Sequence, residues 1–316
     1  MMKANIHIKR MKGVRYLMNQ ALSSYTSMQV GGRTAMILQP EDMDALVRLT
    51  TYLHEKNVPF YILGGGTNTI FGEDGFPGVV IRLGRGFRFL ERLDRNRLHA
   101  GAAGFLPLLL EQSMKWNLSG LEFCYGIPGT VGGAVAGNAG MDGLGIHDFI
   151  TVIHGVTLTG NPVTLRKGDY SYRYRYVEWP KFCLDSTGKV LQKVKDESLI
   201  VTSVVFQMQE ANPEEQNQLL EKYKIMRSRQ PAQRGTAGSI FKNPAGDYAG
   251  RLIEAAGLKG RAIGDALVSP AHGNWIINKG RASAQDVLTL ISLVQNTVFR
   301  RFGVKLEPEV KIVGAP

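Results

Sequence analysis

Apolar residues recur at helical spacing in two segments of the first half of the chain. The first segment follows Pro40-Glu41-Asp42 and ends near Asn57, and one face of it carries Met43, Leu46, Leu49 and Leu53. The second lies between Gly104 and Trp116, and its apolar face carries Leu106, Leu109, Leu110 and Met114. The apolar run 58–63 between them is typical of a buried strand. The pattern therefore predicts alternating strands and helices.

The second half begins with strands and ends with helices. Residues 151–207 carry strand-like apolar runs at both ends, separated by a polar, turn-rich stretch at 185–198. A helix start at Asn212-Pro213-Glu214-Glu215, with a cap, a proline and acidic residues, marks a domain boundary. A later helix begins at a Ser283 cap, ends at Gly303 and buries Val287, Ile291, Val294, Val298 and Phe302.

Two glycine-rich segments, 64–68 and 126–140, place bare backbone where a phosphate or a flat ring could approach. The first follows the predicted strand 58–63, as in a backbone-lined anion site. It is not a Rossmann fingerprint, because Thr69 takes the sixth position and residues 71–78 cannot open a helix. We therefore expect a dinucleotide site of another architecture.

The composition is that of a globular protein. A chain of 316 residues, 44% of them hydrophobic and 21% charged, can form two domains with a full core. It has no apolar run of bilayer-spanning length and no secretory signal, so we expect a cytosolic protein without membrane insertion. Cys124 and Cys183 form no paired motif and no cluster with histidines, so we expect buried or half-buried thiols and no metal.

The net charge of +11 would attract a phosphorylated substrate or a polyanion. The lysines and arginines are spread along the chain, however, without a basic block interleaved with aromatics. A generally basic surface is therefore favoured over a nucleic-acid interface. The sequence does not determine the oligomeric state, and a monomer is favoured.

Short segments with possible chemistry each have a plain structural interpretation. Residues 235–244 present Ser239 beside Lys242 and Asn243, but such a serine usually forms a turn, and no Ser-His-Asp or Ser-Lys motif accompanies it. Residues 306–311 could be a charged edge strand. Residues 170–176 could be an exposed strand with tyrosines on one face and arginines on the other. Taken singly, none of these segments requires a catalytic role.

Taken together and in order, these segments resemble the UDP-N-acetylenolpyruvoylglucosamine reductase family, flavoenzymes that make UDP-N-acetylmuramate for bacterial peptidoglycan. The resemblance runs from Tyr25-Thr26-Ser27-Met28-Gln29-Val30-Gly31-Gly32 to Leu306-Glu307-Pro308-Glu309-Val310. It implies an α+β fold and a cytoplasmic oxidoreductase that uses FAD and NADPH. The implied domains are an FAD-binding domain of the vanillyl-alcohol-oxidase type at 1–211, with two subdomains divided near residues 85–95, and a C-terminal α+β substrate-binding domain at 212–316.

The resemblance also implies the site residues. It makes Ser239 the proton donor and Arg173 and Glu309 the other two catalytic residues. The residues implied at FAD are Gly64, Gly65, Gly66, Thr67, Asn68, Gly129, Thr130, Gly132, Gly133 and Asn138. Arg229 and Asn243 are implied at the substrate diphosphate, and Tyr172 beside the sugar nucleotide.

The chemistry of this reaction agrees with the three catalytic residues. Hydride addition to the vinyl carbon of an enolpyruvyl ether leaves carbanion or enolate character beside a carboxylate. Arg173 can hold that carboxylate with a planar, permanently charged fork, and the Ser239 hydroxyl can protonate so basic a carbon. An ionised Glu309 would repel the substrate carboxylate, so we expect Glu309 to be protonated or paired with Arg173 when substrate is bound.

The chain departs from the family pattern at positions that remove no catalytic residue. Arg175 stands where the family usually has serine, and we expect it to be solvated rather than to contact an anion. Met141-Asp142 replaces the common Ala-Tyr, and Asp265 replaces a usual glycine without expected catalytic consequence. Residues 177–198 look like an insertion of a length that is typical of lids or disordered loops.

Two other functions remain open at this point. An FAD-dependent oxidase of the same superfamily would be reduced by an alcohol and would release peroxide without NADPH. A nonenzymatic, basic nucleotide-binding or RNA-binding protein would bind RNA in a salt-sensitive manner without turnover.

Overall fold

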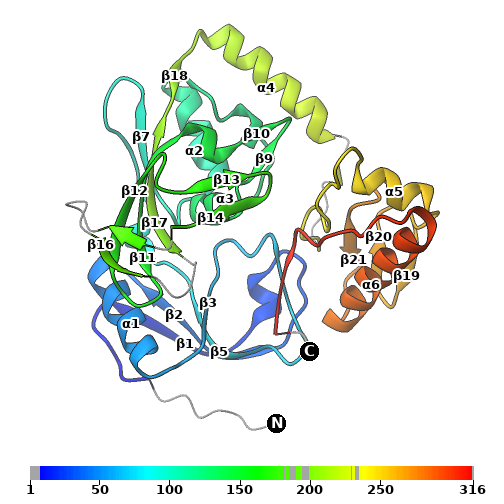
Figure 1. Cartoon of the computed structure of the whole chain (residues 1–316), viewed down its shortest axis with the longest axis horizontal. Coiled ribbons are helices and arrows are strands. Elements are labelled where there is room, and N and C mark those ends of the chain that lie inside the picture. The colour runs from blue at the N-terminus through cyan, green and yellow to red at the C-terminus, as the bar shows by residue number, and fades with distance from the viewer. Residues whose placement is uncertain are drawn as a thin grey trace. The chain divides into compact units, whose positions relative to one another are not determined.

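The computed structural model describes residues 8–180, 182–184, 190–193, 199–228, 230–231 and 235–314. The chain forms two compact units that interleave along the sequence (Figure 1). Unit 1 comprises Met1–Leu17, Met36–Gly65 and Gly78–Lys224, and unit 2 comprises Met18–Ala35, Gly66–Pro77 and Ile225–Pro316. The last change of unit falls within helix α4 (Pro213–Ser228), which begins at the expected residue. The division into domains 1–211 and 212–316 stays a prediction.

A five-stranded sheet in the order β12-β11-β17-β7-β6 lies in unit 1. All four pairings in it are antiparallel. The strands are β6 (Leu90–Arg92), β7 (Arg97–Gly101), β11 (Ile150–Thr157), β12 (Pro162–Arg166) and β17 (Leu199–Gln207). Nearly every residue of the central strand β17 is buried, because neighbouring strands cover both of its edges and its faces are packed. The strand pattern predicted for 151–207 is confirmed at both ends.

A second sheet has the order β1-β2-β5-β3, and helix α1 (Met43–Glu55) belongs to its core. Its strands are β1 (Val14–Ala21), β2 (Arg33–Pro40), β3 (Phe60–Ile62) and β5 (Phe76–Ile81). Asp42 caps α1 by accepting a hydrogen bond from the Ala45 amide at 2.7 Å. Leu46, Leu49 and Leu53 are fully buried as predicted, whereas Met43 in the first turn is 37% exposed.

The second glycine segment contains a short helix, where we had expected loop backbone throughout. After the predicted helix α2 (Leu106–Lys115), residues Val131–Ala136 form α3, with Thr130 as its cap. Glycine is needed here for close packing, because a Cβ atom on Gly132 would lie 2.9 Å from the Cβ atom of Ala102. The small residues, which predicted a loop, therefore allow α3 to pack against Ala102, the residue after β7.

Residues 171–178 form a hairpin, so the prediction of one exposed strand at 170–176 is wrong. β13 (Ser171–Arg173) pairs antiparallel with β14 (Tyr176–Glu178), and Arg173 lies opposite Tyr176. The chain reverses at Tyr174 and Arg175, and Arg175 takes a left-handed conformation with φ of 55°. Because the strand reverses, the tyrosines and arginines are not separated onto two faces. In the insertion, β15 (Phe182–Leu184) pairs antiparallel with β16 (Val190–Lys193), and the rest of 181–198 lies outside the described residues.

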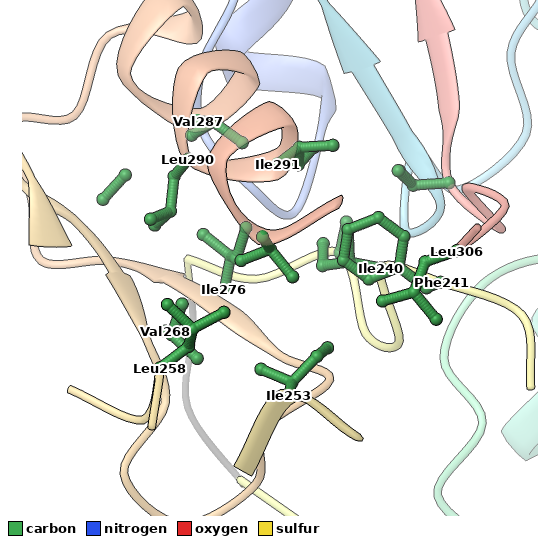
Figure 2. Packing of buried hydrophobic residues seen from close by; sticks show 14 of the residues in the cluster. Ile240, Phe241, Ile253, Leu258, Val268, Ile276, Val287, Leu290, Ile291 and Leu306 are labelled. Carbon is green, nitrogen blue, oxygen red and sulfur yellow. The ribbon is translucent and has the colours of Figure 1, made fainter. Parts of the chain in front are cut away.

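Helices and a small sheet enclose the hydrophobic core of unit 2. β19 (Ala262–Ile263), β20 (Ala266–Val268) and β21 (Ile276–Asn278) form a three-stranded antiparallel sheet. The helices are α5 (Ala249–Ala255) and α6 (Ala284–Phe302). Figure 2 shows Val287, Leu290 and Ile291 of α6 in one cluster with Ile276 of β21.

Both predicted ends of α6 are confirmed. The Ser283 hydroxyl accepts from the Asp286 amide, and the Asp286 carboxylate accepts from the Ser283 amide, which is a capping box. Gly303 ends the helix with φ of 69°. Phe302, which was expected in the buried stripe, is 40% exposed because it lies in the last turn, beyond the part of the helix that the core covers.

The remaining elements are short. In unit 2, β4 (Thr69–Phe71) pairs parallel with β22 (Lys311–Val313), so residues 306–310 precede the strand instead of forming it. In unit 1, β8 (Leu118–Ser119) pairs with β18 (Gln209–Glu210), and β9 (Gly140–Met141) with β10 (Leu144–Gly145). The 3-10 helices are Leu22–Tyr25, Arg85–Phe87, Glu122–Cys124 and Ile146–Phe149.

Candidate functional site

The two glycine segments predicted at the cofactor meet within unit 1. A Cβ atom on Gly64 would lie 2.7 Å from the Thr130 hydroxyl, and one on Gly65 would lie 2.8 Å from the Gly129 Cα atom. Any other residue would push the two segments apart, so glycine is required by the close approach. We call Gly64, Gly65, Gly129, Thr130 and Gly133 the glycine cradle.

The glycine cradle presents backbone donors. Among the described residues, the amides of Gly64, Gly65 and Gly129 donate no hydrogen bond to the protein, and all three residues are partly exposed. The Thr130 hydroxyl accepts weakly from the Gly133 amide at 3.4 Å, whereas the Gly132 amide is bonded to the Ala102 carbonyl. Free backbone amides that converge at a turn suit the oxygens of a phosphate group. The cradle therefore fits a pyrophosphate.

The rest of the first glycine segment belongs to unit 2. Gly66 has φ of 67° and lies so close to the Tyr25 backbone that a Cβ atom on it would be 2.0 Å from the Tyr25 carbonyl oxygen. Asn68 donates from its side chain to the Glu309 carbonyl at 3.3 Å. Its own carbonyl accepts from the Lys311 amide at 3.0 Å. Gly66, Thr67 and Asn68 thus precede strand β4, whose neighbour β22 begins two residues after Glu309.

In unit 2 the backbone of Glu309 lies next to the segment that carries Ser239. The Glu309 amide donates to the Ile240 carbonyl at 2.8 Å, and Ile240 follows Ser239 directly. Ser239 and Glu309 are both half-buried. Among the described residues the Ser239 hydroxyl makes no hydrogen bond, so it is available to a ligand.

The predicted substrate contacts of unit 2 are placed only in part. The Asn243 side-chain oxygen accepts from the Ala249 amide at 3.1 Å, at the start of α5. Nearby, Lys242 forms an ion pair with Glu307 at 2.6 Å. Arg229 lies outside the described residues.

Arg173 and Tyr172 lie in the β13–β14 hairpin of unit 1. The Arg173 side chain is exposed, and its guanidinium stacks 4.2 Å from the centre of the Tyr176 ring. The Tyr172 hydroxyl donates to the Asp148 carboxylate at 3.2 Å. Burial and the negative charge of Asp148 raise the pKa of Tyr172, so this hydroxyl stays protonated at neutral pH.

Asn138 uses its side chain within the protein. Its amide nitrogen donates to the Arg173 carbonyl at 2.9 Å, and its amide oxygen accepts from the His147 amide at 3.4 Å. The residue is only 6% exposed. Its predicted contact with FAD stays a prediction, and the structure connects it to the hairpin that carries Arg173.

Arg175 is half-buried and bonded, so the expectation that it is merely solvated is wrong. Its guanidinium donates to the Gly140 carbonyl at 2.9 Å and to the Asn138 carbonyl at 3.4 Å. The other departures have structural roles of their own. Asp142 lies in the β9–β10 turn with φ of 56° and pairs with Lys222, and Asp265 accepts from the Arg281 amide.

His147 was not singled out by the sequence, because a lone histidine outside any motif gives no signal. It is fully buried, and its ring stacks on Tyr172 with centroids 5.1 Å apart. Nε2 lies 2.7 Å from the Val135 carbonyl and therefore carries the proton, so Nδ1 accepts from the Tyr170 hydroxyl at 3.1 Å. Burial lowers the pKa of His147 and raises the pKa of Tyr170, so both groups are uncharged at neutral pH.

Burial of His147 predicts acid-sensitive stability. Its pKa lies below the ordinary value of 6.5, so below that pH the unfolded chain binds a proton that the folded chain does not. Stability should therefore fall as the pH drops from neutral. In His147→Gln, which keeps a donor for Val135 but does not titrate, the slope of unfolding free energy against pH should be shallower, by up to about 1.4 kcal/mol per pH unit. Urea denaturation between about pH 7 and pH 5 measures both slopes, and parallel curves would contradict the prediction.

Within the described ranges, no group of three or more His, Cys, Asp or Glu residues is arranged to hold a metal ion. No helix in that part of the chain is long and apolar enough to cross a membrane. Cys124 is a buried, reduced thiol, as expected, and the side chain of Cys183 lies outside the described residues.

Two family models match this chain. Residues 34–166 match an FAD binding domain, and residues 230–313 match the C-terminal domain of UDP-N-acetylenolpyruvoylglucosamine reductase. The first match includes the whole glycine cradle and residues 66–68, and the second includes Ser239 and Glu309. The predicted α+β fold with an FAD-binding domain is confirmed.

The chain is also similar to whole proteins. It is 40% identical to UDP-N-acetylenolpyruvoylglucosamine reductase 2 of Symbiobacterium thermophilum, over 93% of this chain and 91% of that protein. It is 36% identical to the reductase of Bacillus subtilis, over 95% and 94%. The crystal structure of the Thermus caldophilus reductase superposes with a TM-score of 0.77 at 33% identity, covering 95% of this chain and 98% of that one. This chain therefore belongs to the UDP-N-acetylenolpyruvoylglucosamine reductase family.

Proposed function

We propose that this protein reduces UDP-N-acetylglucosamine enolpyruvate to UDP-N-acetylmuramate, with NADPH as the hydride donor and FAD as the bound cofactor. The observation that carries the proposal is the 40% identity to a reductase of this name over 93% of the chain. The product UDP-N-acetylmuramate would serve peptidoglycan synthesis, and a nucleotide-sugar substrate favours a cytoplasmic location for the step. The proposed partner is a small molecule, and a monomer stays the favoured oligomeric state.

The residues of the glycine cradle fit FAD. The free amides of Gly64, Gly65 and Gly129 would hold its pyrophosphate, because Gly65 lies against Gly129 and all three residues are partly exposed. The chemistry that bound FAD supplies is the relay of a hydride from NADPH to the vinyl carbon of the substrate. The protein's own task is then to hold the substrate carboxylate and to deliver a proton.

Gly65→Ala should release FAD. The added methyl group would meet the Gly129 backbone at 2.8 Å, so the two segments of the glycine cradle must separate. Gly137→Ala is a matched control, because its Cβ atom would lie an ordinary 3.6 Å from the Gly133 carbonyl and its φ of −104° suits alanine. The measurement is the ratio of flavin to protein absorbance after gel filtration. A Gly65→Ala protein that folds and keeps a full complement of flavin would contradict the role of the cradle.

Arg173 is proposed to hold the substrate carboxylate. Its guanidinium is exposed and always charged, and stacking on Tyr176 orients its plane. As hydride adds to the vinyl carbon, negative charge moves onto that carboxylate and strengthens the interaction. Arg173 therefore stabilises the transition state more than the ground state.

Ser239 is proposed to protonate the carbon next to the carboxylate. Its hydroxyl is half-buried and makes no hydrogen bond to the described residues, so substrate can approach it directly. A hydroxyl is a weak acid, but the carbanion that it would meet is far more basic.

Glu309 is proposed to be protonated, or paired with Arg173, in the substrate complex. An ionised, unpaired carboxylate would repel the substrate carboxylate, and Glu309 is held on the backbone of Ile240 directly after Ser239. Tyr172, Arg229 and Asn243 are proposed to contact the rest of the substrate, as the family resemblance implies.

Glu309→Gln should therefore retain most of the activity, within about 10-fold of the wild type, because an amide resembles a protonated carboxyl group in shape and can donate a hydrogen bond. Glu309→Ala removes the group and should be slower than Glu309→Gln. Steady-state kinetics compare the two variants. Infrared difference spectra of the wild-type substrate complex provide a second test, and an ionised, unpaired Glu309 in them would refute the proposal.

Anaerobic reduction separates the proposed function from its alternatives. NADPH should bleach the flavin of the purified protein, and the UDP-sugar enolpyruvyl ether should restore the colour. An FAD-dependent oxidase would instead be bleached by an alcohol and would release peroxide in air. A protein that cannot be reconstituted with FAD but binds RNA in a salt-sensitive manner would be a nucleic-acid-binding protein.

A further inference from the structure

Two residues other than glycine hold left-handed backbone close to each other in unit 1. Asn138, with φ of 43°, follows α3, and Arg175, with φ of 55°, lies in the turn between β13 and β14. A left-handed conformation costs an ordinary residue about 1–2 kcal/mol. It persists where surrounding interactions fix it, and such positions cluster at functional sites.

The segments around Asn138 and Arg175 are bonded to each other in both directions. The Asn138 side chain donates to the Arg173 carbonyl at 2.9 Å. The Arg175 side chain donates to the Gly140 carbonyl at 2.9 Å and to the Asn138 carbonyl at 3.4 Å. We call these three hydrogen bonds the reciprocal clasp. Figure 1 shows β13 and β14 beside α3, as these bonds require.

Arginine suits this position chemically. Backbone carbonyl oxygens are hydrogen-bond acceptors, and the guanidinium group can donate to two of them at once. Hydrogen bonds from a charged donor are stronger than those between neutral groups. Stacking on Tyr174, with Cζ 5.0 Å from the ring centre, holds the side chain further. These interactions offset the cost of the left-handed backbone.

The reciprocal clasp fixes Arg173 from one side, and the core fixes it from the other. On the side of Tyr172, the ring stacks on buried His147 and the hydroxyl is bonded to Asp148. On the other side, Arg175 ties the turn to the residues after α3. Because Thr130 of the glycine cradle caps α3, the clasp also links Arg173 to the cradle within unit 1.

We propose that Arg175 is a positioning residue: it holds the β13–β14 turn against the residues that follow α3, and so fixes where the Arg173 guanidinium acts. This rests on the proposed function, which assigns Arg173 to the substrate carboxylate. Both terminal nitrogens of Arg175 donate to backbone carbonyl groups, which favours a positioning role over direct contact with an anion.

A double-mutant cycle with Arg175→Gly and Arg173→Ala tests the proposal on the full-length holoenzyme. Glycine removes the two hydrogen bonds that Arg175 donates in the clasp and tolerates the left-handed backbone, so the fold should be kept. Arg175→Gly should slow the transfer to substrate by about 10-fold to 100-fold, as expected for a misplaced catalytic group, and leave reduction by NADPH unchanged. In the Arg173→Ala background the same change should have an effect of less than about 2-fold, because there is no guanidinium left to position.

Hydrogen exchange on the apoprotein gives a readout that does not depend on activity. Arg175→Gly should speed exchange in peptides that cover residues 171–178 and 138–141, and Arg175→Lys, which keeps the charge but not the fork, should lie between it and the wild type. Asn57→Gly is the matched control, since Asn57 is an exposed left-handed residue at the end of α1. It should leave both exchange and rates unchanged.

The outcomes are distinguishable. Additive rate effects in an active wild type, or unchanged exchange in Arg175→Gly, would overturn the positioning role alone. A wild-type protein that holds FAD but cannot reduce the enolpyruvyl ether would overturn the proposed function, and the positioning role with it.

Discussion

Ser239→Ala is expected to leave the reduction of bound flavin by NADPH unchanged and to slow the transfer to substrate by about two to four orders of magnitude. That range is usual for the loss of a positioned general acid. The two half-reactions separate because NADPH delivers a hydride without needing a proton from Ser239, whereas the reduced substrate cannot be completed without one. Anaerobic stopped-flow measurements of each half-reaction provide the test.

Ser292→Ala is a suitable control for this measurement. Ser292 is exposed on α6 of the same unit, so its replacement removes a hydroxyl without touching the candidate site. Both half-reactions should keep their wild-type rates in this variant. If Ser239→Ala damaged both half-reactions equally, Ser239 would be a structural residue or a cofactor contact instead of the proton donor.

The regular elements could be predicted where local sequence and burial agree. For α6, the Ser283 cap, the Asp286 partner and Gly303 set both ends within the helix's own sequence. For α1, the Asp42 cap sets the start of the helix, and the leucines on one face identify the buried side. The errors fell at helix ends, where Met43 and Phe302 match the periodicity but extend past the surface that the core covers.

The sequence of the glycine segments predicted their exposed backbone but not their contact with each other. Their composition indicated bare backbone, but the contact of Gly65 with Gly129 depends on the tertiary fold that brings these distant residues together. The helix α3 was missed because glycine and valine, which make up most of it, have weak helical preference, and here packing on Ala102 decides the outcome.

The hairpin at 171–178 was missed for a different reason. Its turn residues, Tyr174 and Arg175, are not turn formers, and strand preference alone predicts one continuous strand. The left-handed conformation of Arg175 is fixed by carbonyl groups that lie about 35 residues earlier in the chain, as the separation of Arg175 and Gly140 shows. Such a long-range cause leaves no local signal.

The catalytic assignments came from the resemblance, because taken singly each segment had a plain structural interpretation. The structure adds that Ser239 and Glu309 are linked through one backbone hydrogen bond at Ile240, although they are distant in sequence. It also adds that Arg173 is anchored through its backbone by Asn138. Neither relationship could be derived from spacing, because both depend on tertiary pairing.

Arg173→Ala is expected to lower kcat for substrate reduction by about 100-fold to 1,000-fold, the usual loss when a charge-stabilising donor is removed. KM should rise less than kcat falls, because negative charge on the substrate carboxylate grows as the hydride is added. Arg173→Lys keeps the charge but loses the planar fork, so it should recover part of this loss. The rate of flavin reduction by NADPH should stay at the wild-type value in both variants.

Arg166→Ala tests whether the loss comes from the position of the charge or from the charge alone. Arg166 is an exposed arginine on β12 of the same unit, so its removal lowers the net charge equally while leaving the hairpin intact. Its kcat and KM should match the wild type. If Arg173→Ala raised only KM and left kcat unchanged, Arg173 would bind substrate and transition state equally well and would not be catalytic. If Arg166→Ala were as slow as Arg173→Ala, general electrostatic attraction of an anionic substrate would explain both variants.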